Sequence, residues 1–263
     1  MWKRLELDIL RQPDNVTCGP TCLHAVYRYY HDEIPLETVI RETPQLEDGG
    51  TLAVLLGQHA LSRGYRATIY TYNLQVFDPT WFLPGGPDLV ERLYAQMEVK
   101  SSPRLHVASH AYIDFLQAGG KIVMRDLTAN LLRRYLNRDV PVLAGLSSTY
   151  LYGCSREIAA TCEPDDVAGV AAGHFVVLCG YDRRRRKVLV ADPYLPNLAG
   201  LAHYYEVTLD RLVCAIMLGV LTYDANLLII EPGRRARRRI LQRSSQRDPK
   251  HPGLAPRSQP APL

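Results

Sequence analysis

The sequence has no apolar run long enough to cross a membrane. Its longest run, Leu212–Tyr223, has about 12 residues and is followed by Asp224, whereas a membrane-spanning helix needs about 20. The first residues, Met1 to Asp8, are charged throughout and do not have the pattern of a secretory signal. We therefore expect a cytoplasmic protein without a membrane span.

Paired cysteine motifs are also missing. The chain has 6 cysteines, and they lack both the dense spacing of a disulfide scaffold and the paired Cys-x-x-Cys of a zinc site. His106, His110 and Asp114 fall on one helical face at a spacing that zinc can use, but neither a nearby Cys nor a Glu placed as a base accompanies them. A solvated helix face explains them more simply, and we expect no metal and no cofactor.

Outside the C-terminal end, basic residues do not outnumber acidic ones. The formal net charge is +4, but residues 232–263 hold nine of the 31 Lys and Arg residues and one of the 27 acidic residues. The rest of the chain has no basic surplus and no recognised nucleic-acid motif, so we expect no requirement for nucleic acid. The end itself is rich in Arg, Pro, Ser and Gln, which favours disorder. We expect one domain over residues 1–231 and a disordered basic tail over residues 232–263.

The stretch from Gln12 to Tyr30 predicts a cysteine at the start of a helix. Turn residues precede Cys18, and Gly19 and Pro20 follow it, with Pro20 suited to the first helical position. The next apolar side chains recur at helical spacing, so one face enters the core while Cys18 stays at the exposed N-terminal end. The helix dipole and the free N–H groups at that end stabilise an anion, which favours a nucleophilic thiolate.

A histidine and an acid that could serve such a nucleophile lie on two predicted strands. Residues 173–181 and 187–194 have the apolar content of buried strands and are joined by a charged turn. With a three-residue turn, 182–184, the strands pair so that His174 lies directly opposite Asp192 on the same face. A turn one residue longer or shorter would put the two side chains on opposite faces.

Together these motifs resemble the papain-like cysteine peptidases. The resemblance rests on Gln12 six residues before the Cys-Gly-Pro-Thr-Cys helix start, on Gly-His-Phe-Val-Val at the head of a strand, and on Ala-Asp-Pro-Tyr after it. Within these peptidases the chain is most similar to the peptidase C39-like group, which is related to the double-glycine leader peptidases. The resemblance implies an α+β fold, with an N-terminal helical half carrying the cysteine and an antiparallel sheet carrying the histidine and the aspartate. It also implies Cys18 as nucleophile, His174 as base and then acid, Asp192 as the residue that orients His174, and Gln12 as a side-chain oxyanion donor.

Two less regular segments are expected to shape the substrate cleft. Residues 73–119 are turn-rich and then helical, and they resemble an insertion that covers a cleft. Residues 147–173 form a long connection that ends just before His174, and a loop of that length in a compact domain is usually functional or disordered. Its early part contains Tyr150 and Tyr152, which we expect to contact the substrate.

These features predict a cysteine peptidase that hydrolyses a peptide or amide bond, with a peptide or protein as its partner. The Cys18 thiolate attacks a carbonyl, and Gln12 and the Cys18 backbone N–H hold the oxyanion. His174, oriented by Asp192, protonates the leaving group and then activates water. An amine could resolve the same acyl-enzyme, which would make a transpeptidase or acyltransferase. A non-catalytic peptide-binding module is a further alternative, and the sequence leaves the substrate and the oligomeric state open.

Overall fold

The fold is centred on one 8-stranded sheet. In this computed structural model, which describes residues 2–46, 49–197 and 200–246, the strands are β1 (Trp2–Arg4), β2 (Tyr65–Thr71), β3 (Lys121–Val123), β4 (Val142–Ser147), β5 (Gly173–Asp182), β6 (Lys187–Ala191), β7 (Tyr204–Thr208) and β8 (Asn226–Pro232). Their order is β3-β2-β8-β4-β5-β6-β7, with β1 paired to β5. The β2–β3 pair is parallel, and the other pairs in the described residues are antiparallel.

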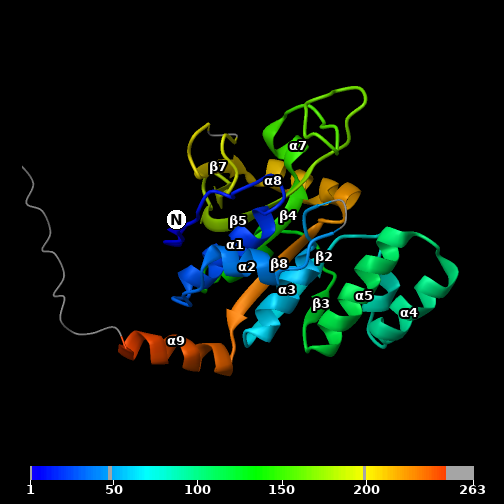
Figure 1. Ribbon diagram of the computed structural model, residues 1–263, viewed down its shortest axis with the longest axis horizontal. Coiled ribbons are helices and arrows are strands. Elements are labelled where there is room, and N and C mark those ends of the chain that lie inside the picture. The colour runs from blue at the N-terminus through cyan, green and yellow to red at the C-terminus, as the bar shows by residue number, and fades with distance from the viewer. Residues whose placement is uncertain (1, 47–48, 198–199, 247–263) are drawn as a thin grey trace, which may run out of the picture.

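Helices surround this sheet (Figure 1). They are α1 (Cys18–Tyr29), α2 (Leu36–Glu42), α3 (Ala53–Ser62), α4 (Leu89–Val99), α5 (Pro103–Gln117), α6 (Ala129–Leu136), α7 (Ser148–Tyr152), α8 (Leu209–Leu218) and α9 (Arg234–Gln246), with short 3-10 helices η1 (Pro79–Phe82) and η2 (Gly219–Thr222). The helix α1 packs on β5, α3 packs on β2 and β8, and α8 packs on β4, β6 and β7. The expected α+β class, with an N-terminal helical region and a largely antiparallel sheet, is confirmed.

The strand β5 is central because its sequence is almost continuously apolar. Every residue from His174 to Tyr181 is buried, as expected for a strand that is covered on both faces. Within the described ranges, no helix is both long enough and apolar enough to cross a bilayer.

The turn between β5 and β6 is longer than expected. Asp182 pairs with Lys187, so the turn has four residues, 183–186, rather than three. By itself, a four-residue turn would put Asp192 on the opposite face of the sheet from His174. A β-bulge between Leu178 and Gly180 shifts the register by one residue and restores the parity.

Beyond the bulge, the pairing differs from the expected one by two residues. Leu178 pairs with Val190, so continuing this register places Val176 beside Asp192. His174 and Asp192 share a face, but as diagonal neighbours rather than directly opposed residues. The expectation of a shared face therefore holds, while the three-residue turn and the direct opposition were wrong.

Most of residues 73–119 lies at one edge of the sheet. The helices α4 and α5 pack on each other, and α5 also packs on α3 and β3 (Figure 1). Arg104, near the start of α5, lines the cleft described below. Residues 73–119, which we expected to cover the cleft, therefore contribute Arg104 to one side of it.

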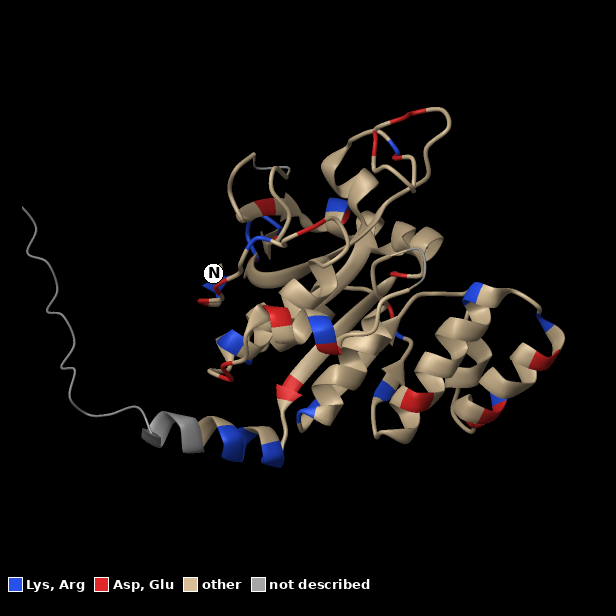
Figure 2. Cartoon of the chain, in the orientation of Figure 1, with Lys and Arg blue, Asp and Glu red and all other residues tan. Residues whose placement is uncertain are grey.

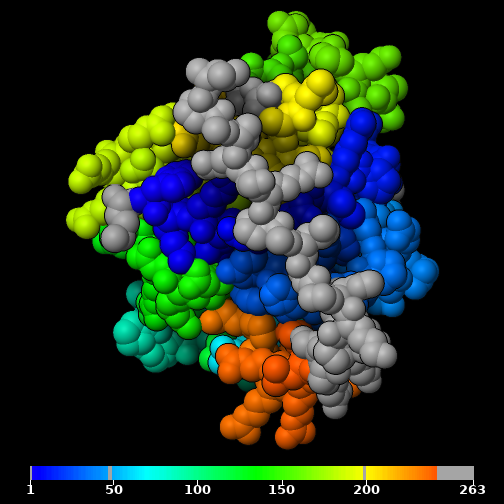
Figure 3. All heavy atoms as spheres, turned by 90° about the vertical axis from the view of Figure 1, so that its left-hand side faces the viewer, coloured from blue at the N-terminus to red at the C-terminus, as the bar shows by residue number. Residues whose placement is uncertain are grey.

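The basic C-terminal segment begins with a helix, α9, where we expected disorder. Arg239 in α9 donates hydrogen bonds to the side chain of Asp32, which has no exposed surface. A buried carboxylate requires such a charged partner, and this contact fastens the start of the expected tail to the body. Figure 2 marks the basic residues of α9 in blue on the cartoon, and Figure 3 shows the helix at one end of the molecule. Residues 247–263, the remainder of the expected tail, lie outside the described residues.

Candidate active site

A cleft of about 250 Å³ brings together the ends of several elements. Cys18 at the start of α1 and His174 in β5 both line it. So do Arg104 from α5, Glu157 from the connection between α7 and β5, and Asp224 from the turn before β8. The cleft therefore combines a thiol with several ionisable groups from distant parts of the sequence.

The close packing of the α1 N-terminus positions Cys18. The helix begins at Cys18 itself, with Thr17 as its N-cap, two residues before the expected start at Pro20. At Gly19 a Cβ would come within 2.6 Å of the side chain of Thr51, so only glycine lets the helix start lie this close to its neighbours. Cys18 is 8% exposed and still lines the cleft.

His174 lies between the carboxylate of Asp192 and the thiol of Cys18. Its Nε2 atom is 2.9 Å from Asp192 Oδ1, and the ring also hydrogen-bonds Cys18. Burial opposes the charged form of His174, but the Asp192 carboxylate and Cys18, together with these hydrogen bonds, outweigh it and raise the pKa to about 10. Because Nε2 is engaged with Asp192, the other ring nitrogen remains for proton exchange with Cys18.

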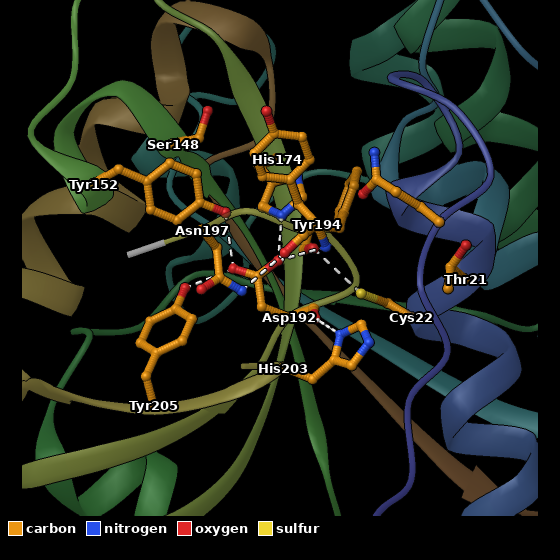
Figure 4. A network of polar contacts seen from close by, with 12 residues as sticks. Thr21, Cys22, Ser148, Tyr152, His174, Asp192, Tyr194, Asn197, His203 and Tyr205 are labelled. Carbon is orange, nitrogen blue, oxygen red and sulfur yellow. Dashed lines mark hydrogen bonds and ion pairs between the residues drawn. The ribbon is translucent and has the colours of Figure 1, made fainter. Parts of the chain in front are cut away.

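Hydrogen-bond donors surround the Asp192 carboxylate (Figure 4). Oδ2 accepts from the hydroxyls of Tyr152 at 2.8 Å and Tyr205 at 2.6 Å. Oδ1 accepts from the backbone N–H of Tyr194 at 2.9 Å in addition to its contact with His174. Burial alone would raise the pKa of Asp192, but the charge of His174 and these hydrogen bonds hold it below its usual range. Asp192 is thus a fixed anion that can orient and charge the imidazole.

Gln12 ties the loop before Cys18 to the chain that follows Asp192. Its backbone N–H donates to the carbonyl of Pro193 at 2.9 Å. Its side chain is 6% exposed, and Nε2 donates to the carbonyl of Asp14 at 2.6 Å. The amide has a second N–H that this contact does not use, so the oxyanion role stays a prediction.

Tyr150 and Tyr152 were expected to contact substrate, and the structure gives them other surroundings. Tyr150 is 40% exposed, with the guanidinium of Arg211 5.4 Å from its ring centre. Tyr152 directs its hydroxyl to Asp192. Among the described residues neither tyrosine lines the cleft, and a contact of either with substrate stays a prediction.

Two residues near the site were missed in the sequence. Tyr205 was assigned only to a strand, because the alternation of buried side chains in β7 shows that it points inward but not that it reaches Asp192. Asp224 was seen only as the end of an apolar run. An acid directly after such a run is a usable signal, since a chain leaving a core tends to carry that acid to a boundary between core and surface.

Comparisons with known proteins give one family match. The Peptidase_C39 like family matches residues 99–210, and no curated protein matches the chain. Similar solved structures include a double glycine motif protease from an AMS/PCAT transporter in complex with the leader peptide, at 15% identity over 88% of this chain and 94% of that chain, with a TM-score of 0.43.

Two further solved structures are similar. A putative C39-like peptidase from Bacillus anthracis is 14% identical over 88% of this chain and 97% of that chain, with a TM-score of 0.44. Xylellain, a cysteine protease from Xylella fastidiosa, is 14% identical over 89% of this chain and 86% of that chain, with a TM-score of 0.42.

The matched segment contains His174 and Asp192, whereas Cys18 lies before it. The two residues that share the 2.9 Å contact are therefore inside the match, and residues 99–210 of this chain are similar to the Peptidase_C39 like family.

Proposed function

We propose that this protein hydrolyses a peptide or amide bond with Cys18 as nucleophile, His174 as general base and acid, and Asp192 as the residue that orients His174. The observation that carries the proposal is the 2.9 Å contact between His174 Nε2 and Asp192 Oδ1 beside a cleft that Cys18 also lines. A nucleophilic thiol requires a paired and oriented base. A module that only binds peptides does not.

The proposed reaction has two halves. The thiolate of Cys18 attacks the substrate carbonyl while His174 holds the thiol proton, and His174 then gives that proton to the leaving amine. In the second half His174 takes a proton from water, which attacks the acyl-enzyme and releases the acid. Asp192 keeps the imidazole in one orientation and stabilises its charge throughout.

The oxyanion requires donors at the same place. We assign these to the backbone N–H of Cys18, at the first turn of α1, and to the free amide N–H of Gln12. The similarity of residues 99–210 to the Peptidase_C39 like family supports a peptide as substrate.

A peptide library tests this proposal. The wild-type protein should cleave some of its members, Cys18→Ala should cleave none, and Cys214→Ala, which changes an exposed cysteine of α8, should behave as the wild type. Adding a primary amine to the cleavage reaction separates hydrolysis from acyl transfer, because a transferase yields the amine adduct.

Thiol labelling provides a second readout that needs no substrate. Iodoacetamide at mildly acidic pH should label Cys18 before the exposed Cys154, Cys162 and Cys214, as read by peptide mapping. Equal labelling of the four cysteines, together with an uncut library, would leave a binding module as the better description.

A further inference from the structure

The cleft contains a carboxyl group, Asp224, that the proposed chemistry does not use. Asp224 lies between η2 and β8, lines the cleft with His174 and is 6% exposed. Its Oδ1 atom is buried and has no hydrogen-bond partner among the described residues. Because a buried polar atom without a partner costs free energy, this oxygen is a ready acceptor for a donor that the substrate brings.

Close packing holds Asp224 beside the candidate base. At Gly173, the residue before His174, a Cβ would lie 2.3 Å from Asp224 Oδ2 and 2.7 Å from Thr222 Oγ1. Thr222 also hydrogen-bonds the carboxyl. The missing side chain at Gly173 therefore lets the carboxyl approach the backbone next to His174, while Oδ1 stays without a hydrogen bond.

The groups around Asp224 hold it close to the point of ionisation. They are Arg104 and Tyr112 from α5, His174 from β5 and Thr222 from η2. Burial raises the pKa of Asp224, and the Thr222 hydrogen bond and the charges of Arg104 and His174 oppose this, leaving a pKa of about 7. The charge of Asp224 in turn helps to raise the pKa of Tyr112, so this tyrosine stays neutral.

A second carboxyl and a cation complete the cleft wall. Glu157 is half-buried in the same cleft, and burial raises its pKa. The Arg104 guanidinium lies 5.1 Å from the ring centre of Tyr223 and donates to the carbonyl of Thr222 at 3.3 Å. Arg104 is thus packed on the turn that carries Asp224, and it favours the ionised form of that carboxyl without a hydrogen bond to Oδ1.

We propose that Asp224, assisted by Glu157, forms a specificity subsite for a cationic side chain of the substrate, lysine or arginine. The inference rests on the proposed peptidase function, and it assigns the substrate class of that same cleft. An ammonium or guanidinium group would supply the donor that Oδ1 lacks and the positive charge that two carboxyls in one cleft wall favour. The preference should strengthen as the pH rises through about 7, where Asp224 becomes an anion and lysine stays charged.

Cleavage of matched peptides tests the subsite. In a peptide that the enzyme cuts, each position around the cut bond is made in turn lysine or norleucine, and kcat/KM is compared at pH 6 and pH 8. At one position we expect lysine to be preferred by at least about tenfold at pH 8 and by less at pH 6. Asp224→Asn should abolish both the preference and its pH dependence, and Asp166→Asn, which alters a carboxyl outside the cleft wall, should keep both.

Two results would overturn the subsite. One is the absence of a lysine preference at every position, and the other is a preference that Asp224→Asn retains while its thermal midpoint shows a folded protein. Glu157→Gln should weaken the preference by a smaller factor, because this side chain is only half-buried and solvent screens its charge.

Binding separates this inference from the proposed function. Fluorescence anisotropy measures binding of the same lysine and norleucine peptides to Cys18→Ala, with and without Asp224→Asn. If the wild type cleaves peptides but neither cleavage nor binding depends on Asp224, the peptidase stands and the subsite fails. If Cys18→Ala binds lysine peptides through Asp224 but the wild type cuts none, the subsite stands and the peptidase fails.

Discussion

Two buried carboxyl groups, Asp192 and Asp224, lie near His174 and are held in opposite states. Asp192 accepts 4 hydrogen bonds, and its pKa is lowered. Asp224 has an oxygen without a partner, and its pKa is raised to about 7. Burial pushes both pKa values upward, so the donors and the close charge of His174 decide the difference. Nearly equal burial thus yields a permanent anion for orientation and a titrating group suited to recognition.

Replacing Asp192 should have the largest effect. In Asp192→Asn the imidazole loses its anionic partner, and under the proposed function kcat/KM should fall by up to about 10⁴. The pKa of His174, about 10 in the wild type, should fall because the carboxylate that stabilises the imidazolium is gone. The basic limb of the pH profile, where the imidazolium loses its proton, should move to lower pH. A mutant with an unchanged profile would remove Asp192 from its proposed role.

A third buried carboxyl group, Asp32, accepts hydrogen bonds from Arg239 and so attaches α9 to the rest of the protein. Arg239→Ala removes charged hydrogen bonds to Asp32 and should lower the free energy of unfolding by about 1.5 to 3 kcal/mol. Urea denaturation measures this, with Arg238→Ala, an exposed neighbour in α9, as the matched control. If the chain is disordered from residue 232 onward, both mutants should have the wild-type free energy of unfolding.

Asp224 should make the stability of the protein depend on pH. Its pKa is near 7 when folded and 3.8 ordinarily, so between these values the folded state holds a proton that the unfolded state has released. This contribution is fully present below about pH 3.8 and is lost as pH rises through 7. The advantage of Asp224→Asn over the wild type should therefore grow as the pH rises from 5 to 7 and then level off, by roughly 2 to 3 kcal/mol in all. Parallel thermal midpoints for the two proteins across this range would contradict the raised pKa.

Removing one hydrogen-bond donor from Asp192 should raise its pKa and so bring it closer to the state of Asp224. Tyr205→Phe deletes the 2.6 Å hydrogen bond to Asp192 Oδ2 and leaves the ring in place. A net loss of about 1 kcal/mol corresponds to a fall of kcat/KM of no more than about tenfold, and the pKa of Asp192 should rise. The matched variant Tyr152→Phe removes the 2.8 Å bond to the same oxygen. A double mutant whose effect exceeds the sum of the two would show that one tyrosine compensates for the other.

The elements that carry the candidate site could be predicted because their signals are local. Turn residues followed by helical periodicity put Cys18 at the start of α1, and continuous apolar runs marked β5 and β6. The period of two along a strand predicted a shared face for His174 and Asp192, which lie 2.9 Å apart. These properties depend on residues close together in the chain.

Tertiary structure decided what depends on contacts between distant segments. The bulge at β5 compensates for a four-residue turn and keeps His174 and Asp192 on one face, and β5 and β6 are each also paired with a further strand, β4 and β7. The donors on Asp192 come from α7 and β7, and α9 docks on an acid more than 200 residues before it. Composition predicted a disordered tail because it ignores such a partner. Asp224 acquires its raised pKa only where β5, α5 and η2 exclude water from it, which no local pattern encodes.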